Sequence, residues 1–378
     1  MRVFVIAGEA SGDKLGAALM TGLAWLVPDI TFDGVGGPLM QAQGLQSRFP
    51  MDELSVMGVA EILPKYRALK ARVHDMAQAV LDTKPDVLVT IDSPDFGLRV
   101  AKLVKARSDI RCVHYVAPTV WAWRPNRAAK MAKHIDQVLA LFPFEPPFMQ
   151  AAGMRCDFVG HPVVTDPMAT PDQVASWYGD GPLIMLLPGS RRGEVSRLLP
   201  RFGEVAALIT ARHPTARFAI PTTANVTQIV RDTVADWDVP VQVLDADQRD
   251  AKAGLFAAAD MAVAASGTVS LELAANTTPM VIAYDMAWLS RVIISRMLLV
   301  DTVTLVNLVS DTRVIPEFIG KDCEPAAIAD AALAVLDDPS GQMAAMATTM
   351  ERLGLGGDAP GLRAARAVLD GLANAHQE

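Results

Sequence analysis

The chain of 378 residues is long enough for two domains, since single domains usually hold roughly 100–200 residues. Hydrophobic residues make up 51% and charged residues 20%, a globular composition, and the net charge of −8 argues against a general nucleic-acid binder. No apolar run reaches the roughly 18 residues of a membrane span, and the N-terminus does not resemble a signal peptide, so we expect a cytoplasmic protein.

Short apolar runs alternate with amphipathic helical patterns along the chain. Their continuous apolar character predicts strands buried on both faces, as in a parallel sheet, and hence an α/β fold. A proline-rich stretch over 160–171 predicts a linker. We expect two Rossmann-like domains facing each other across a cleft, residues 1–165 and 166–354, with a final helix at about 355–378 that packs back on the first. The predicted strands are Val3–Ala7, Asp86–Ile91, Cys112–Val116, Gln137–Phe142, Leu183–Leu187, Phe218–Ile220, Val241–Leu244, Met261–Ala265 and Met280–Tyr284.

Two stretches place a Gly/Ser turn between an apolar strand and a helical pattern. Val3–Ala7 runs into Gly8-Glu-Ala-Ser-Gly-Asp13, and Leu183–Leu187 runs into Pro188-Gly-Ser-Arg-Arg-Gly-Glu194. Free N–H groups at such helix N-termini bind anions. One copy is weak evidence, whereas one copy in each half predicts a phosphorylated ligand held between two domains.

The first turn does not match GxGxxG, and the chain contains no GxxxxGK[ST]. We therefore expect neither a dinucleotide site nor ATP hydrolysis through a P-loop. Glu9 and Ser11 are candidate acceptor-side residues that point into the cleft. The alternative is an ordinary turn in which Ser11 caps the following helix.

Two carboxylates, Asp92 and Asp95, follow a buried run of the first half. At the C-terminal end of a parallel strand, where doubly wound folds bind ligands, an Asp can accept a proton from a substrate hydroxyl. Helix capping by Asp95 or Ser93 is the alternative role. We assign the cap to Asp95 and the catalytic base to Asp92.

The segment His114-Tyr-Val-Ala-Pro-Thr-Val-Trp-Ala-Trp-Arg124 contains two of the six Trp residues. Core packing is the ordinary role of Trp. The alternative is a platform for sugar or acyl chains, with Arg124 or Arg127 holding a phosphate. The residues leave both open, and Trp123 with Arg124 are the candidate substrate-binding residues. His114 is interpreted as a packed core residue.

The second half carries two turns suited to a nucleoside diphosphate. The turn at 188–191 adds the guanidinium of Arg191 to a helix N-terminus, which suits a diphosphate. Another Ser-Gly-Thr turn follows a buried strand, and Glu272 comes one helical turn later, where a carboxylate can take both hydroxyls of a ribose. The alternative is helix capping by Ser266 and Thr268, with Glu272 exposed. The candidate donor-binding residues are Gly189, Ser190, Arg191, Ser266, Gly267, Thr268 and Glu272.

Other features are less specific. Cys112, Cys156 and Cys323 form no CxxC pair and fit reduced structural thiols, and without a His/Asp/Cys set at ligand spacing we predict no metal site and no cofactor. The stretch Val56–Tyr66 is apolar and then basic, as is Trp288–Val300 in part. Each fits ordinary core or a membrane-surface patch that meets anionic head groups.

Ten motifs are spread over nearly the whole chain. They are Ala7-Gly-Glu-Ala-Ser-Gly-Asp13, Gly36-Gly-Pro-Leu-Met40, Met57-Gly58, Ile91-Asp-Ser-Pro-Asp-Phe96, His114–Arg124, Phe142-Pro-Phe-Glu145, Gly160-His-Pro162, Leu187-Pro-Gly-Ser-Arg191, Ser266-Gly-Thr268 with Glu272, and Asn307. In composition and order these motifs resemble those of the lipid-A-disaccharide synthases. The resemblance implies an inverting GT-B glycosyltransferase, which would transfer 2,3-diacylglucosamine from UDP-2,3-diacylglucosamine to 2,3-diacylglucosamine 1-phosphate, at the inner face of the cytoplasmic membrane.

The resemblance also implies roles for individual residues and leaves two rival functions. Asp92 matches the family's base, Arg191 its phosphate-binding arginine, Glu272 its ribose carboxylate and Asn307 an essential cleft asparagine, while Glu9 and Ser11 match the first-domain loop. A homodimer that swaps its C-terminal segments is a further implication. The rivals are another GT-B enzyme acting on UDP-sugars, such as a UDP-N-acetylglucosamine 2-epimerase, and a non-catalytic nucleotide- or lipid-binding module.

Overall fold

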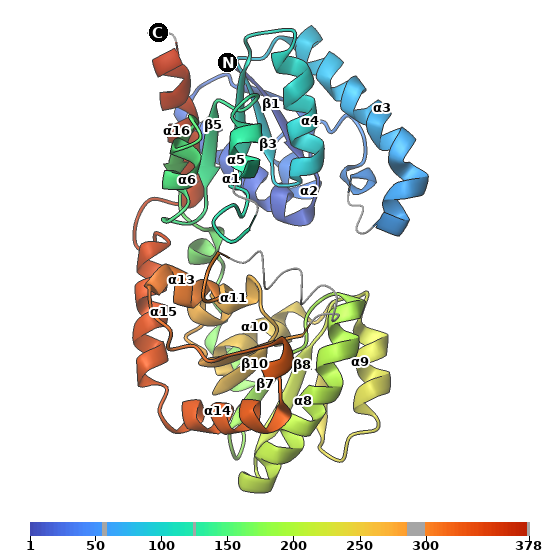
Figure 1. Ribbon diagram of the computed structural model, residues 1–378, viewed down its shortest axis with the longest axis vertical. Helices are drawn as coiled ribbons and strands as arrows, with labels where there is room; N and C mark the ends of the chain where they lie inside the picture. Colours follow the sequence, from blue (N-terminus) through green and yellow to red (C-terminus); the bar gives the residue numbers. More distant parts are fainter. Residues whose placement is uncertain (55–58, 124–125, 286–298, 376–378) are drawn as a thin grey trace. The chain divides into compact units, whose positions relative to one another are not determined.

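A computed structural model describes residues 1–54, 59–123, 126–285 and 299–375. The chain forms two compact units (Figure 1). Unit 1 combines Met1–Thr165 with Gly356–Glu378, and unit 2 is Asp166–Leu355. In the described residues each unit contains a six-stranded sheet in which all strand pairs are parallel.

The sheet of unit 1 has the order β2-β1-β3-β4-β5-β6. From β1 the chain moves to β2 at one side of the sheet, and it then crosses back to β3 on the other side of β1. The topological switch point therefore lies between β1 and β3. Ligands of doubly wound folds bind at that point, beyond the carboxyl ends of the strands. The strands are β1 (Arg2–Ala7), β2 (Thr31–Val35), β3 (Val87–Ile91), β4 (Arg111–Tyr115), β5 (Gln137–Ala140) and β6 (Arg155–Phe158).

Helices cover both faces of this sheet, and the last helix of the chain is one of them (Figure 1). Helix α16 (Pro360–Ala375) packs against α1 (Ala10–Leu26), and the side-chain amide of Gln137 on β5 donates to the Ala367 carbonyl at 2.8 Å. The other helices are α2 (Pro38–Ala42), α3 (Val59–Thr83), α4 (Pro94–Lys105), α5 (Asn126–Met131) and α6 (Pro146–Gln150), with 3-10 turns at Met51–Glu53 and Pro162–Thr165.

The sheet of unit 2 has the order β12-β11-β10-β7-β8-β9, so its switch point lies between β7 and β10. The strands are β7 (Leu183–Leu187), β8 (Arg217–Pro221), β9 (Val241–Leu244), β10 (Met261–Ala264), β11 (Met280–Tyr284) and β12 (Glu317–Ile319). The helices are α7 (Pro171–Ala175), α8 (Arg192–Arg212), α9 (Thr227–Val234), α10 (Arg249–Ala258), α11 (Val269–Ala275), α13 (Leu305–Ser310), α14 (Pro325–Asp337) and α15 (Ser340–Arg352), with a 3-10 turn at Gly320–Asp322.

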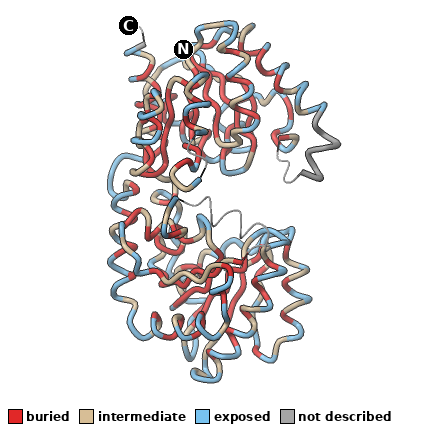
Figure 2. The backbone as a smooth tube through the Cα atoms, in the orientation of Figure 1, coloured by how far each residue is buried: buried red, intermediate tan, exposed pale blue. Residues whose placement is uncertain are grey.

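Most of the buried residues lie in the two sheets and in the helix faces that cover them (Figure 2). Every residue of β3, β5, β7 and β10 is buried, as expected for strands covered on both faces. The three cysteines are buried, and no disulfide joins them. Across the described ranges, no helix combines the length and apolar character needed to cross a membrane.

All nine predicted strands are present, but β2, β6 and β12 were missed, and several predicted ends were wrong. The run predicted to extend to Phe142 ends at Ala140. The reason is that the N–H groups of Leu141 and Phe142 donate to the Glu145 carboxylate, at 3.1 and 3.0 Å, instead of to a neighbouring strand.

Candidate active site

A pocket of about 470 Å³ opens in unit 2 where the carboxyl ends of β7, β8 and β10 meet. Its volume falls in the range of small-molecule sites, roughly 300–1,000 Å³. It surrounds the switch point of the sheet, where this kind of fold binds ligands. All seven donor-binding candidates line it: Gly189, Ser190, Arg191, Ser266, Gly267, Thr268 and Glu272.

The turn after β7 requires a glycine and presents backbone donors. Gly189 has φ +104°, and a Cβ there would lie 2.7 Å from Oε2 of Glu194, so other residues would be strained. Arg191 is the N-cap residue of α8, whose first N–H groups have no partner inside the helix. Its side chain is 67% exposed and pairs with Glu194 at 3.0 Å, an exposed contact that a phosphate can replace.

Asn225, in the loop after the neighbouring strand β8, holds this turn, a role that the sequence analysis missed. Its Nδ2 donates to the Ser190 carbonyl at 2.8 Å, and its Oδ1 accepts from Thr223 Oγ1 at 2.7 Å. Thr222 and Thr223 line the pocket, as do Lys252 and Phe256 of α10. The detectable signal was a polar cluster, Thr222-Thr-Ala-Asn225, directly after an apolar strand.

The turn after β10 is not a side-chain cap of α11. Thr268 occupies the N-cap position without a capping side-chain bond, and Ser266 Oγ donates to the Val303 carbonyl at 3.4 Å, near the outer limit of a hydrogen bond. Glu272 is half-buried and lines the pocket with Thr268. The capping alternative for Ser266 and Thr268 is therefore wrong, and Glu272 is not fully exposed.

In unit 1, Ser11 and Asp92 meet across the switch point of the sheet. Ser11 follows β1 and Asp92 follows β3, and Ser11 Oγ donates to Asp92 Oδ2 at 2.9 Å. The other carboxylate oxygen accepts the N–H of Ser93 at 2.9 Å. Asp92 and Ser93 both have positive φ, +50° and +40°, a conformation that non-glycine residues adopt rarely and mostly where surrounding structure imposes it.

Helix capping in unit 1 differs from the sequence analysis. Ser93, not Asp95, is the N-cap residue of α4, and its side chain makes no capping bond. Asp95 lies exposed in the first turn, where a carboxylate favours the helix dipole. Ser11 lies inside α1, whose N-cap residue is the half-buried Glu9, so Ser11 is not a cap either.

Asp13, the last residue of the first turn motif, is a buried structural anchor. Its carboxylate accepts the N–H groups of Gly37, Leu39 and Met40 at 2.9–3.0 Å. These are orphan donors at the N-terminus of α2, so Asp13 caps a helix distant in sequence. A Cβ on Gly37 would lie 2.5 Å from Asp13 Oδ2, which explains the glycine there.

The aromatic segment after β4 is partly core and partly surface. Trp121 packs edge-on against Phe144 at 5.1 Å, while Trp123 is 36% exposed and donates from Nε1 to Thr119 Oγ1. Arg124, the other substrate-binding candidate, lies outside the described residues. His114 is buried, and its Nδ1 lies 2.7 Å from Thr90 Oγ1. Burial lowers the pKa of its imidazole to about 4, so His114 is a neutral core residue near pH 7.

Asn307 does not line the pocket of unit 2. Its side chain is 1% exposed, its Oδ1 accepts the N–H of Ile315 at 3.0 Å, and its Nδ2 donates to the Ile315 carbonyl at 3.0 Å. A side chain engaged in this way has little left to offer a substrate. The structure therefore gives no support to a catalytic contact by Asn307.

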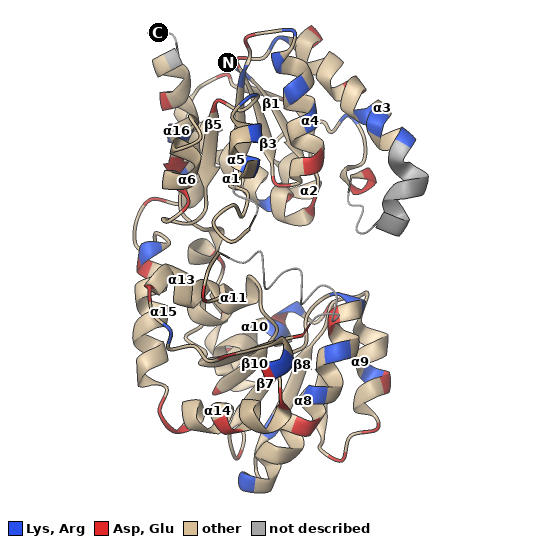
Figure 3. Ribbon diagram, in the orientation of Figure 1, with Lys and Arg blue, Asp and Glu red and all other residues tan. Residues whose placement is uncertain are grey.

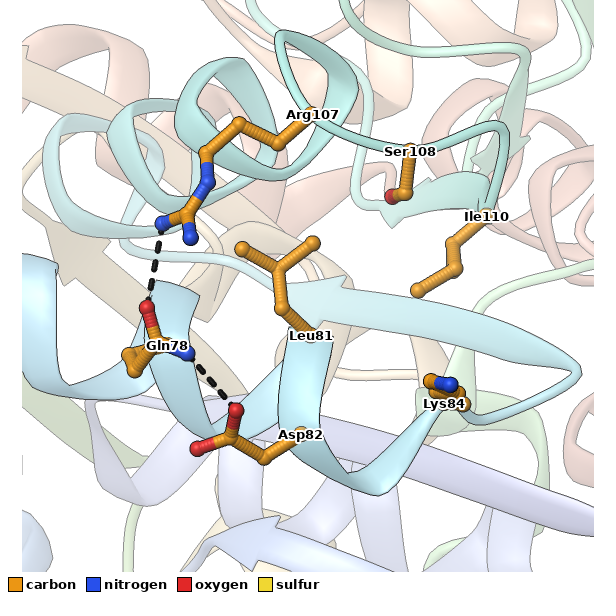
Figure 4. A pocket seen from close by; sticks show the side chains of 7 residues that line it. All are labelled: Gln78, Leu81, Asp82, Lys84, Arg107, Ser108 and Ile110. Carbon is orange, nitrogen blue, oxygen red and sulfur yellow. Dashed lines mark hydrogen bonds between the residues drawn. The ribbon is translucent and has the colours of Figure 1, made fainter.

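A second pocket lies in unit 1 at the amino ends of the strands, at the edge of the sheet opposite to Ser11 and Asp92 (Figure 4). There Arg107 donates to Gln78 at 3.0 Å, and Gln78 donates to Asp82 at 2.6 Å. None of the predicted site residues lines it. Among the described residues, no three or more His, Cys, Asp or Glu side chains are grouped so as to hold a metal ion.

Two Rossmann-like units, each with a polar site at the carboxyl edge of a parallel sheet, define the GT-B fold. Solved structures share this fold. Because their sequence identity to this chain is only 11–13%, the likeness concerns the fold alone. They include a putative UDP-N-acetylglucosamine 2-epimerase from Listeria monocytogenes (TM-score 0.66, 12% identity, 100% of this chain and 97% of that chain). The Neisseria meningitidis UDP-GlcNAc 2-epimerase bound to UDP-GlcNAc has a TM-score of 0.64 (11%, 99% and 100%), and Acinetobacter baumannii MurG has 0.53 (13%, 99% and 99%).

Sequence relatives are more specific than the fold. The lipid-A-disaccharide synthase of Ruegeria pomeroyi is 60% identical over 383 residues, covering 98% of this chain and 96% of that protein. That of Rhodospirillum centenum is 44% identical, covering 97% and 94%. A family model described as lipid-A-disaccharide synthetase matches residues 3–359. The chain belongs to this family and is a glycosyltransferase of lipid A biosynthesis, so the resemblance and the predicted fold are confirmed.

Proposed function

We propose that this protein transfers 2,3-diacylglucosamine from UDP-2,3-diacylglucosamine to the 6-hydroxyl of 2,3-diacylglucosamine 1-phosphate. The products are a β-1,6-linked disaccharide 1-phosphate and UDP. The observation that carries the proposal is the pocket of unit 2 around Gly189 and Ser266, which gathers two strand-to-helix turns, a guanidinium and a carboxylate in a chain of this family.

The donor's nucleotide would occupy that pocket. Arg191 and the N–H groups at the start of α8 would bind the diphosphate, and Glu272 would accept the ribose hydroxyls. Lys252, which also lines the pocket, adds a second cation. As the sugar C1–O bond to UDP breaks, negative charge grows on the diphosphate, and fixed dipoles and cations of this kind stabilise it.

Asp92 would act as the general base. The acceptor's 6-hydroxyl oxygen forms the new bond to C1 from the face opposite UDP, and its proton passes to the Asp92 carboxylate. Ser11 and Ser93 hold that carboxylate through one hydrogen bond to each oxygen. Glu9 and Ser11 would also meet the acceptor, as would Trp123 and Arg124.

The chemistry so described uses only side chains and backbone groups, and we propose that no metal ion takes part. The test is transfer between the two diacylated substrates in detergent with excess EDTA, followed by detection of the disaccharide phosphate and UDP. We expect undiminished turnover with EDTA. Activity that EDTA removes and Mg²⁺ restores would contradict metal independence while leaving the reaction intact.

The same assay separates the principal rival, a UDP-N-acetylglucosamine 2-epimerase, which shares the fold. An epimerase would consume soluble UDP-N-acetylglucosamine and form no disaccharide from the acylated pair. A binding module without activity would bind UDP and transfer nothing.

We also propose that the protein acts at the cytoplasmic face of the inner membrane, as a peripheral protein, because both substrates carry acyl chains. Figure 3 shows Lys and Arg positions along α3. Of these, Arg67 and Lys70 are exposed cations suited to anionic head groups, whereas Arg72 is paired with Glu53 at 2.9 Å. Val56–Gly58 and Trp288–Arg296, the apolar parts of the predicted patches, lie outside the described residues. Homodimer formation stays a prediction, measurable by light scattering.

A further inference from the structure

One carboxylate organises the backbone beside the donor pocket. Oε1 of Glu317 accepts three hydrogen bonds, from Thr302 Oγ1 at 2.6 Å, from the Val303 N–H at 3.0 Å and from the Thr304 N–H at 2.7 Å. Thr302 and Thr304 are each 1% exposed. Removing the acceptor would leave buried donors without partners, which is costly.

Glu317 is itself fixed by the edge of the unit 2 sheet. It is the first residue of β12 and pairs in register with Ile282 of β11, whose N–H donates to the Pro316 carbonyl at 2.9 Å. An acceptor carried by a strand is placed more accurately than one carried by a loop.

Asn307 joins the same network from the other side. Besides its two bonds to the Ile315 backbone, its Nδ2 donates to Thr302 Oγ1 at 3.3 Å. The Thr302 hydroxyl therefore donates to Glu317 and accepts from Asn307. Together the three side chains fix the backbone between 302 and 315.

Two contacts connect this network to residues that line the donor pocket. The Val303 carbonyl accepts from Ser266 Oγ at 3.4 Å, and Ser266 lines the pocket. Helix α13 begins directly after Thr304 and contacts α11, the helix that carries Glu272. Neither Glu317, Thr302 nor Asn307 lines the pocket itself.

We propose that Glu317, Thr302 and Asn307 are positioning residues for the nucleotide of the donor. They hold segment 302–304 so that the Ser266 turn and α11 meet the nucleoside diphosphate in a fixed geometry. The inference rests on the proposed function of the pocket. It gives Asn307 a role that does not require substrate contact.

The first test compares Glu317→Gln with Glu317→Met. Glutamine keeps an oxygen that can accept the three bonds, whereas methionine has a similar length and no such acceptor. We expect Glu317→Gln to bind UDP with nearly the wild-type Kd, and Glu317→Met to bind about tenfold more weakly. The KM for the donor should rise in parallel, and the KM for the acceptor should stay unchanged, a split that general destabilisation would not produce.

A second pair keeps the test decisive if Glu317→Met does not fold. Thr302→Val removes the hydroxyl at nearly constant volume, and Thr302→Ser retains it, so only the valine variant should lose UDP affinity. Combined with Ser266→Ala, Thr302→Val should cost less than in the wild-type background, because both act through the same turn.

Two failures would be distinguishable. If Glu317→Met and Thr302→Val fold and bind UDP with the wild-type Kd, the positioning role is wrong and the donor site stands. If the wild-type protein binds no UDP, the donor site itself is wrong, and the positioning role falls with it.

Discussion

At the scale of single residues, Asp92 has its two carboxylate oxygens engaged by different partners. Ser11 Oγ bonds to Oδ2 and the Ser93 N–H to Oδ1, and Asp92 sits in a backbone conformation with φ +50°. Asp95, only three residues later, is exposed in the first turn of α4. The structure thus gives the two neighbouring carboxylates different environments.

We expect Asp92→Asn to lower kcat by on the order of 100-fold or more, because the amide cannot accept the proton of the acceptor hydroxyl. UDP affinity should stay the same, since the described residues that line the proposed donor pocket all belong to unit 2. Steady-state transfer kinetics and UDP titration measure the two effects. Asp95→Asn is the matched control, and a large loss of kcat there instead would move the base to Asp95.

Glu145 is 2% exposed, and burial raises the pKa of its carboxyl to about 7, against the lowering effect of the hydrogen bonds that it accepts. The folded state therefore binds this proton more strongly than the unfolded state, where the pKa is about 4.5. Stability from this group is present at low pH and declines as pH rises from about 4.5 to about 7, by on the order of 3 kcal/mol.

Glu145→Gln should remove that decline, because the amide oxygen can still accept the N–H groups of Leu141 and Phe142 and does not titrate. Urea unfolding at pH 5 and pH 8 measures it. The stability lost between the two pH values should be smaller in the glutamine variant than in the wild type. Equal losses in both proteins would show that Glu145 does not titrate in this window.

At the scale of elements, the strands that the sequence analysis missed are all at sheet edges. β2, β6 and β12 end their sheets, and their sequences, Thr31-Phe-Asp-Gly-Val35, Arg155-Cys-Asp-Phe158 and Glu317-Phe-Ile319, include charged residues. An edge strand is partly solvated and needs no continuous apolar run, so patterning detects inner strands more readily. The edge strand β9 was predicted because its sequence is mostly apolar.

The contact between α1 and α16 depends on two glycines. A Cβ on Gly361 would lie 2.5 Å from the Ala18 carbonyl oxygen, and one on Gly22 would lie 2.7 Å from the Gly361 carbonyl oxygen. Because both neighbours are backbone atoms, the helices would have to move apart. We expect Gly361→Ala to lower the free energy of unfolding by about 1–3 kcal/mol.

Gly341→Ala on α15 is the control, since a Cβ added at Gly341 would meet nothing within 4 Å and alanine favours a helix. It should leave stability unchanged or raise it slightly. Thermal unfolding of both variants measures the difference. A Gly361→Ala protein as stable as Gly341→Ala would mean that the helix pair tolerates a wider spacing.

At the scale of the whole molecule, the grouping of the candidate residues around one pocket of unit 2 was largely predictable, whereas the residues that hold its turns in place were not. The residues around Gly189 and Ser266 follow apolar strands, and parallel strands bring their carboxyl ends to one edge. Asn225 bonds to the Gly189 turn from the loop after β8, and Glu317 on β12 bonds to Val303, through contacts that no local pattern encodes. The same holds for Asn307, whose place in a buried network separates it from the pocket.

The division of the chain also has a consequence for its synthesis. Unit 2 is one continuous stretch, whereas unit 1 needs α16, which is made only after all of unit 2. Until then the surface of α1 around Ala18 and Gly22, and the Gln137 amide, have no partner from α16. The α16-binding surface of unit 1 is therefore uncovered throughout the synthesis of unit 2, and transiently exposed apolar surface of this kind favours aggregation.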